Sequence, residues 1–401
     1  MSDCRSADLF VPPDEEERIL SGRFLVITAA TFAYFLALGT LLPTLPKYVK
    51  DELHSGGVSV GLVVGAFAVS AALIRPWAGR IGDRYGRRVL LSGGAVLVGL
   101  STLAYALVDT VPALVAIRLV TGLGEAAVFV GAATAIQDMA PSHRRGEAAS
   151  YFSVALFSGL AVGPALGEHL ARTYDYDMVW IVAGAWALVA AVFGLGTPSV
   201  RASEAVRPAS LLHPAAIGPG LVLMLGILPF TGFAAFLAIY GPEIGLSDTG
   251  PVFFAYAGMV LAIRIFGAKV PDRLGWRRAS TIALASAVAG ILVMAVWPSV
   301  IAVWMATLAL GVGGSLLYPA LFTAVLEDVP EHERSQAVGT FSLFFDLSQG
   351  IGAPLLGLVV ALSNERGAFF VAALIGAGGF WAQRRLHATQ AAAAEVEPAV
   401  A

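Results

Sequence analysis

Charged residues and glycines of this chain recur in register at a fixed offset of 189 positions, and this repeat limits the possible folds more than any other feature. Charged residues make up only 13% of the 401 positions, so chance similarity between apolar stretches does not account for their register. A duplicated block of apolar helices joined by short basic loops is typical of secondary transporters, in which two related halves surround a central site. The paired positions are Arg75, Asp83, Arg84, Gly86, Arg88, Gly122, Gly124 and Gly163 in the first copy, and Arg264, Asp272, Arg273, Gly275, Arg277, Gly311, Gly313 and Gly352 in the second.

The composition excludes a set of soluble domains and predicts twelve membrane spans. Hydrophobic residues make up 57% of the chain, and the mean hydropathy is +0.78. Each apolar run is long enough to cross a bilayer, where a backbone must satisfy its own hydrogen bonds and therefore forms a helix. We predict an all-α membrane protein with twelve transmembrane helices in two pseudo-symmetric six-helix bundles. The predicted spans are 24–46, 58–78, 89–109, 112–138, 147–170, 178–197, 215–240, 250–268, 279–297, 299–326, 337–362 and 367–386.

The basic residues predict the orientation of the chain in the membrane. Most of the 25 Lys and Arg residues fall on the side of the two termini, whereas Lys47, Lys50, Arg172 and Arg366 fall in loops on the other side. Because basic loops are retained in the cytoplasm, we predict cytoplasmic termini in the inner membrane. The predicted segments are a tail 1–22, a first bundle 23–199, a linker 200–214, a second bundle 215–386 and a tail 387–401.

A loop between the second and third predicted helices carries the sharpest local pattern. Its sequence, Gly79-Arg-Ile-Gly-Asp83-Arg84-Tyr-Gly86-Arg87-Arg88, resembles the loop signature G-x-x-x-D-R-x-G-R-R of the major facilitator superfamily. A degenerate copy with Asp272 and Arg273 lies between the eighth and ninth helices. The resemblance covers all twelve helices and implies a conformational latch. In that latch Asp83 meets the N-terminal end of the helix 337–362, and Arg87 pairs with Asp138.

Two ionisable residues in the fourth predicted helix are candidates for proton coupling. Arg118, Gly122 and Gly124 resemble the R-x-x-x-G-x-G motif of the same family, which is linked with proton transfer. Glu125 follows seven residues after Arg118, about 10 Å along the helix axis. Since a charge in the bilayer costs roughly 2.5–3.5 kcal/mol or more, both side chains are expected to face the bundle interior. A purely structural arginine that bonds neighbouring carbonyls is the alternative for Arg118, whereas Glu125 is expected to be protonatable.

The fifth predicted helix resembles the antiporter motif of drug-exporting members, G-x-x-x-G-P-x-x-G-G. The matching residues are Gly159, Gly163, Pro164 and Gly167. Small residues at this spacing allow close helix contact, and a proline bends the helix. Two positions depart from the pattern, because Ser150 stands for an upstream glycine and Glu168 for the last one. The resemblance favours export over uptake.

Asp346 breaks the repeat, because its counterpart in the first copy is Phe157. It is too deep in its predicted helix to reach the membrane surface, so we expect it to face the central cavity; a carboxylate at a helix interface that bonds a neighbour is the alternative. In the cavity it would form, with Glu125, an acidic pair for protons or for a cationic group of the substrate. Arg75 and Arg264 lie within a turn of their predicted loops, and we expect both to extend to the membrane surface.

These observations predict a secondary transporter that exports a small neutral or amphipathic organic compound, such as a drug or secondary metabolite, by proton antiport with alternating access. Proton-coupled uptake of a sugar-like or other small solute, and a non-transporting membrane receptor or scaffold, are the alternatives. The pattern gives no enzyme motif, metal site, cofactor or nucleic-acid partner, and we expect a monomer in the lipid bilayer. Candidate cavity-lining residues are Tyr34, Phe230, Phe233, Phe236, Tyr240, Tyr318 and Gln349, and helix packing is the alternative role for each of the aromatic ones.

Overall fold

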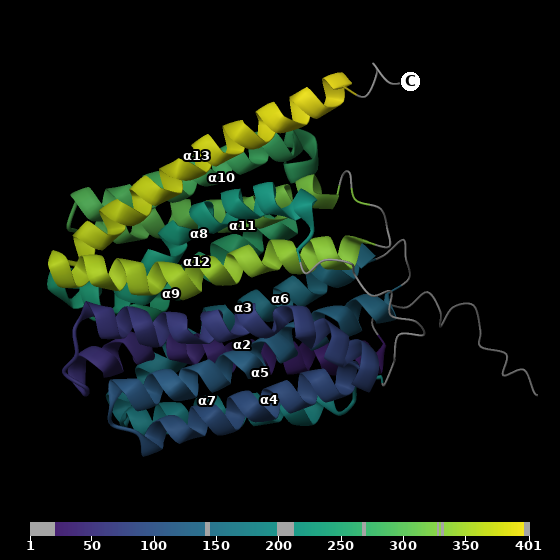
Figure 1. Ribbon diagram of the computed structural model, residues 1–401. Coiled ribbons are helices and arrows are strands. Elements are labelled where there is room, and N and C mark those ends of the chain that lie inside the picture. The colour runs from purple at the N-terminus through teal and green to yellow at the C-terminus, as the bar shows by residue number, and fades with distance from the viewer. Residues whose placement is uncertain are drawn as a thin grey trace, which may run out of the picture.

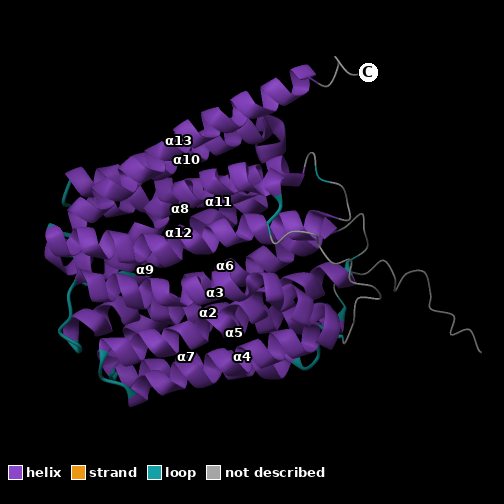
Figure 2. Cartoon of the chain, viewed as in Figure 1, coloured by secondary structure: helices purple, strands orange, loops and turns teal. Residues whose placement is uncertain are grey.

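The protein is a bundle of long helices that run roughly side by side (Figures 1 and 2). The computed structural model describes residues 21–140, 145–198, 212–266, 270–326, 329 and 333–396, and every regular element within these ranges is helical. Two short 3-10 turns, η1 (Ala104–Leu107) and η3 (Gly241–Ile244), directly follow the helices α4 and α8. The α-helices are α2 (Gly22–Asp51), α3 (Gly57–Tyr85), α4 (Arg87–Leu103), α5 (Val111–Met139), α6 (Arg145–Thr173), α7 (Tyr176–Gly194), α8 (Pro214–Tyr240), α9 (Gly250–Phe266), α10 (Val270–Val296), α11 (Val300–Leu326), α12 (Arg334–Leu362) and α13 (Glu365–Val396).

All twelve predicted spans coincide with helices, which confirms the predicted fold class. Ten helices of the described part are long and apolar enough to cross a membrane, and α9 is a shorter apolar helix. Several predicted ends are displaced, among them those of α2, which continues to Asp51 beyond residue 46, and α10, which begins at Val270 before residue 279. Helix α3 continues to Tyr85 instead of ending at residue 78, and α13 continues to Val396 through an alanine-rich segment that we expected to be a tail. Alanine is the best helix former, which explains the extension of α13. Residues 1–20, 199–211 and 397–401 of the predicted tails and linker lie outside the described residues.

The repeat extends to the backbone conformation of its glycines. Gly86, between α3 and α4, has a φ of 94°, and its counterpart Gly275 has a φ of 72°. Side-chain-bearing residues rarely adopt such angles, so a glycine is required at each turn. The non-helical Gly275 divides α10, and the segment before it corresponds to the end of α3.

The helices form two groups, which we call the first half (α2–α7) and the second half (α8–α13). Figure 1 shows them on opposite sides of the molecule. The halves meet mainly where α3 packs on α12 and α6 packs on α9. We call the end of the molecule that carries the loops at 52–56, 174–175, 245–249 and 363–364 the distal end, and the end at which α2 begins and α13 finishes the terminal end.

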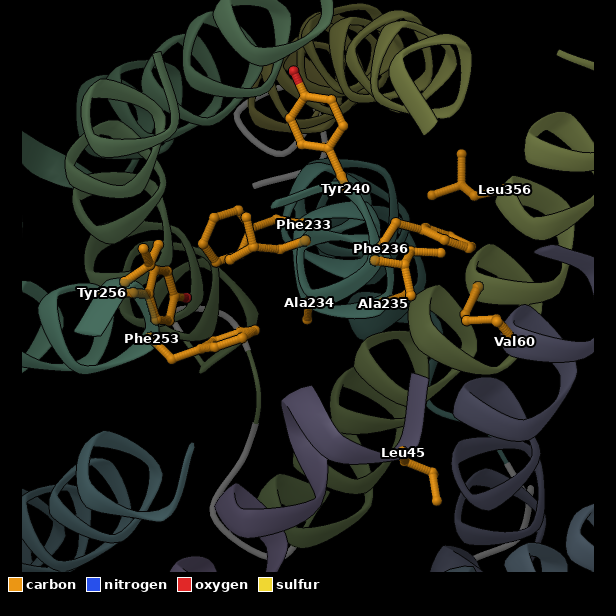
Figure 3. Close-up of a cluster of buried hydrophobic side chains, with 14 of the residues drawn as sticks. Leu45, Val60, Phe233, Ala234, Ala235, Phe236, Tyr240, Phe253, Tyr256 and Leu356 are labelled. Atoms are coloured by element: carbon orange, nitrogen blue, oxygen red, sulfur yellow. The ribbon is translucent and has the colours of Figure 1, made fainter. Parts of the chain in front are cut away.

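The buried hydrophobic side chains show that the halves are joined at the distal end. One cluster there contains Leu45 and Val60 of the first half together with Phe236 and Leu356 of the second (Figure 3). Toward the terminal end each half has a separate cluster, one around Phe24, Leu91 and Ile136 and the other around Leu223, Leu321 and Phe341. The described side chains therefore pack across the two halves in the distal part and within each half in the terminal part.

Candidate functional site

A buried ion pair joins the two halves near the middle of the molecule. Arg75 of α3 donates a hydrogen bond from Nη2 to Oδ1 of Asp346 in α12, over 2.8 Å. The second atom pair, Nε and Oδ2, is close enough for an ion pair but is not aligned as a hydrogen bond. Arg75 is 9% exposed and Asp346 is 4% exposed. The expectation that Arg75 extends to the surface is therefore wrong, because α3 continues ten residues beyond it and places it about 15 Å from the helix end.

Glu125 of α5 lies beside the same arginine. Its Oε2 atom is 3.7 Å from Nη2 of Arg75, and it makes no hydrogen bond. The guanidinium of Arg75 also lies over the ring of Phe129, 4.8 Å from its centroid. The two carboxylates that we expected to form an acidic pair thus face one arginine of the protein. In this conformation Asp346 is enclosed between α3 and α12, where we expected a cavity.

Arg118 has the environment of a structural arginine. Its Nε donates to the carbonyl oxygen of Val63 over 3.0 Å, and Nη2 donates to that of Val64 over 3.5 Å. Nη1 donates to the hydroxyl of Tyr105 over 3.4 Å, and the guanidinium lies 4.3 Å from the ring centroid of Phe67. All three nitrogens are therefore occupied by α3 and η1, in agreement with the alternative that the sequence left open.

Arg264 of α9 also points between the halves. Its Nη1 donates to the hydroxyl of Ser153 in α6 over 2.9 Å, and its guanidinium lies 4.8 Å from the ring centroid of Phe157. The expected extension to the surface is wrong here as well. Tyr318 of α11 is close enough to interact electrostatically with Arg75, Arg264 and Asp346, so these groups belong to one region.

The loop residues are only partly described. Arg87 Nε lies 3.1 Å from Oδ2 of Asp138, the pairing that the loop signature implied. Arg88 donates to the carbonyl oxygen of Thr197 over 2.8 Å and so ties the start of α4 to the end of α7. Arg84 and Arg273 are exposed. The surroundings of Gly79, Asp83 and Asp272 lie outside the described part, and with them the contact expected between Asp83 and α12.

Glu168 of α6, which stands for a motif glycine, makes the densest polar contact between the halves. Its carboxylate accepts hydrogen bonds from the backbone nitrogens of Thr249 (2.9 Å) and Gly250 (2.7 Å) at the start of α9, and from the Thr249 hydroxyl. Lys47 Nζ lies 2.6 Å away. A carboxylate at a helix N-terminus is stabilised by the unsatisfied N–H groups and the helix dipole. Glu168 is 3% exposed, so this contact holds the distal end together in a water-poor environment.

An exposed ion pair lies next to Glu168. Arg172 Nη2 is 3.0 Å from Oδ2 of Asp248, in the loop before α9. The pKa of Asp248 lies below its usual value, first because of the neighbouring Glu168 side chain and also because of Arg172 and the Gly250 N–H.

The glycines of the motif in α6 pack this helix against α2 within the first half. A Cβ atom on Gly163 would lie 2.7 Å from the Cα of Gly39, and one on Gly159 would lie 2.6 Å from the backbone nitrogen of Leu36. Such approach is possible only without side chains. The structure thus gives the three glycines a packing role, and Pro164 lies inside the same helix.

The aromatic residues that we expected to line a cavity divide into two groups. Phe233, Phe236 and Tyr240 are fully buried in the cluster that joins the two halves (Figure 3), so none of them lines a cavity in this conformation. Figure 3 shows them on α8, which is surrounded by other helices. Phe230 is half-buried and stacks on Tyr256, with ring centroids 4.6 Å apart. Tyr34, beside the charged region, is also fully buried and lines no cavity in this conformation, whereas Tyr318 and Gln349 are half-buried.

Comparison with known proteins identifies the family. The family model described as Major Facilitator Superfamily matches residues 27–353, and the chain belongs to this superfamily of membrane transporters. A relative from Salmonella typhimurium, named only as an uncharacterized MFS-type transporter, is 30% identical and covers 86% of this chain and 92% of its own. An uncharacterized MFS-type transporter of Escherichia coli, YhhS, is 26% identical over 85% of this chain and 87% of its own.

Solved transporter structures share the fold at low sequence identity. The nucleoside transporter NupG has a TM-score of 0.73 at 12% identity, over 92% of this chain and 99% of its own. The human organic anion transporter MFSD10 has a TM-score of 0.70 at 18% identity, over 93% of this chain and 100% of its own. The chain is therefore a multi-pass, non-enzymatic transporter of a small molecule in a lipid bilayer. Within the described ranges no three His, Cys, Asp or Glu side chains gather as metal ligands.

Sequence reasoning missed the roles of Arg75 and Glu168. The repeat contained a signal for Arg75. Arg75 and Arg264 are counterparts in the repeat, and so are Asp346 and Phe157, but only Asp346 is a carboxylate. The signal for Glu168 was its departure from a glycine motif at a helix end.

Proposed function

We propose that this transporter exports a small amphipathic organic compound in exchange for protons, with Asp346 and Glu125 as the proton-carrying groups. The observation that carries the proposal is the position of Arg75. It bonds Asp346 of the second half and lies 3.7 Å from Glu125 of its own half. One arginine can therefore change its carboxylate partner, from a contact between the halves to a contact within one half.

Protonation decides between these two partners. When Asp346 is ionised, it pairs with Arg75 and ties α3 to α12. A proton on Asp346 removes the negative charge, and an unpaired arginine in this buried place is strongly unfavourable. Arg75 then pairs with Glu125, and the tie between the halves is lost. Proton binding is in this way linked to separation of the halves, the motion that alternating access requires.

The direction and orientation belong to the same proposal. The α6 glycines that resemble the antiporter motif support export, and the basic residues support a cytoplasmic terminal end in an inner membrane. The halves would move as the bundles 23–199 and 215–386, with the loop residues around Arg87 and Asp138 as the latch at the terminal end. A single chain contains all the groups that the proposal uses.

The test starts with compounds that stabilise the purified protein against heat, because stabilisation identifies bound ligands. A stabilising compound is then followed in proteoliposomes that carry a pH gradient. Export by antiport predicts accumulation in vesicles with an acidic interior, together with proton release from them. Asp346→Asn and Glu125→Gln are each expected to remove the dependence on the gradient. Full proton-driven transport by Glu125→Gln would remove Glu125 from the mechanism.

The same vesicles separate the alternatives. Accumulation with the proton gradient, from an acidic exterior, would indicate an uptake symporter. Ligands that stabilise the protein but produce neither counterflow nor proton movement would indicate a receptor.

A further inference from the structure

Arg264 is a partly buried cation that has no counter-ion among the described residues. Within this part of the chain, only Nη1 of its three guanidinium nitrogens makes a hydrogen bond, to the Ser153 hydroxyl. Nε is buried and has no partner in the described part of the chain. No Asp or Glu of the described residues forms an ion pair with it, whereas Arg75, its counterpart in the repeat, has one at hydrogen-bond distance and a second nearby.

The repeat shows what has replaced the carboxylate. Arg75 meets Asp346 across the α3–α12 contact, and Arg264 meets Phe157 across the α6–α9 contact. Phe157 and Asp346 are counterparts at the offset of 189, so the two contacts have the same construction. An aromatic ring attracts a cation through its electron-rich face and carries no net charge. The positive charge of Arg264 is therefore held in place and left uncompensated.

The number of charges in the central region also leaves the positive charge of Arg264 uncompensated. Three arginines, Arg75, Arg118 and Arg264, stand against two carboxylates, Glu125 and Asp346. Both carboxylates face Arg75. Each of the three guanidinium nitrogens of Arg118 donates a hydrogen bond to a carbonyl or hydroxyl oxygen. Of the three arginines, Arg264 alone has neither a carboxylate within ion-pair distance nor a carbonyl acceptor among the described residues, and its Nε and Nη2 bond none of them. Its side chain is only partly buried, although Nε is covered in this conformation.

We propose that Arg264 is the binding point for one anionic group, a carboxylate or an equivalent monoanion, on an amphipathic organic substrate. This inference rests on the proposed transport function and names its substrate class. The two free donors, Nε and Nη2, match the two oxygens of a carboxylate in a bidentate pair. Tyr318 is close enough to interact electrostatically with Arg264, Arg75 and Asp346, so an anion on Arg264 would lie in the same region as the proton-carrying groups.

The test measures binding in detergent, without a proton gradient. The probes are benzoate and octanoate, each compared with its neutral amide, benzamide and octanamide, by thermal unfolding of the purified protein. We expect at least one carboxylate to stabilise the wild type more than its amide does. In Arg264→Gln the apparent affinity for that carboxylate should fall by roughly tenfold or more, the loss expected for a charge-assisted pair.

The repeat supplies a matched pair of variants. Phe157→Asp places beside Arg264 the carboxylate that its counterpart has, and should abolish carboxylate binding by neutralising the arginine. Phe157→Asn has the same size without the charge and should retain binding. If Arg264→Gln does not fold, this pair carries the same test.

The proposal is overturned if neither carboxylate is preferred over its amide, or if Phe157→Asp and Phe157→Asn bind the carboxylate equally. Either result leaves proton-coupled export in proteoliposomes standing, because binding was measured without a gradient. Conversely, preferred carboxylate binding without proton movement would contradict the antiport mechanism and leave the anion site intact.

Discussion

Replacing Glu168 by glycine, the residue that the related motif has at this position, should open the distal end. The Glu168 carboxylate is 3% exposed and accepts bonds from Thr249 and Gly250 while contacting Lys47. Removing it leaves buried N–H groups and a half-buried ammonium without their acceptor. From the usual effect of breaking a buried charge pair we expect the joined conformation to lose about 3 kcal/mol relative to the open one. That shifts the conformational equilibrium roughly 100-fold.

The assay is a distance measurement between spin labels at the distal end. Cys4 is the only cysteine, so Cys4→Ser gives a background for labels at Asp109 and Trp297, one exposed position in each half. Glu168→Gly should broaden and lengthen the distance distribution. The neighbouring pair between Arg172 and Asp248 is more exposed, and such pairs contribute less than about 1 kcal/mol.

Asp248→Asn is therefore the control, and we expect it to leave the distribution nearly unchanged. An unchanged distribution in Glu168→Gly, or an equal change in Asp248→Asn, would refute the reasoning that burial makes Glu168 the main distal contact.

Three further predictions concern the charged region, the helix packing and pH. Asp346→Asn should weaken the contact between the halves in the same spin-label experiment, because Arg75 loses its partner across the interface; an identical distribution would contradict this. Gly163→Ala should lower the thermal unfolding temperature, since its Cβ would meet Gly39 at 2.7 Å and overpacking costs about 1–3 kcal/mol; an unchanged temperature would show that α6 can shift. Because the pKa of Asp248 is lower in the folded protein than in the unfolded chain, its ionised side chain stabilises the fold. This contribution to stability is complete above the unfolded pKa of about 4 and is lost as the pH falls through the folded pKa. The difference in thermal stability between wild type and Asp248→Asn should thus be constant from about pH 5 to 8 and shrink only below pH 4; a difference that grows on acidification would contradict the sign.

Part of the site was available from the sequence because helical periodicity and membrane depth are local properties. Glu125 and Asp346 were expected in the interior, since an isolated charge facing lipid is too unfavourable, and both are buried. Arg75 was assigned to the membrane surface because the predicted helix ended at residue 78. The helix ends at Tyr85, since Gly86 supplies the first turn conformation that side-chain-bearing residues avoid. Phe233 and Tyr240 could not be distinguished from cavity residues, because packing and lining surfaces have the same composition.

The sequence by itself determined the twelve helices, their duplication and the superfamily, because a backbone in hydrocarbon has no alternative to helix and a repeat needs no contacts to be seen. Only the tertiary structure decided which charges meet. Arg75 and Asp346 are 271 positions apart, and Glu168 reaches α9 across 81 positions. Such pairs depend on how two separate bundles dock, and no local pattern in either bundle contains that information. The same docking leaves Arg264 opposite Phe157, where the first contact of the repeat has a carboxylate.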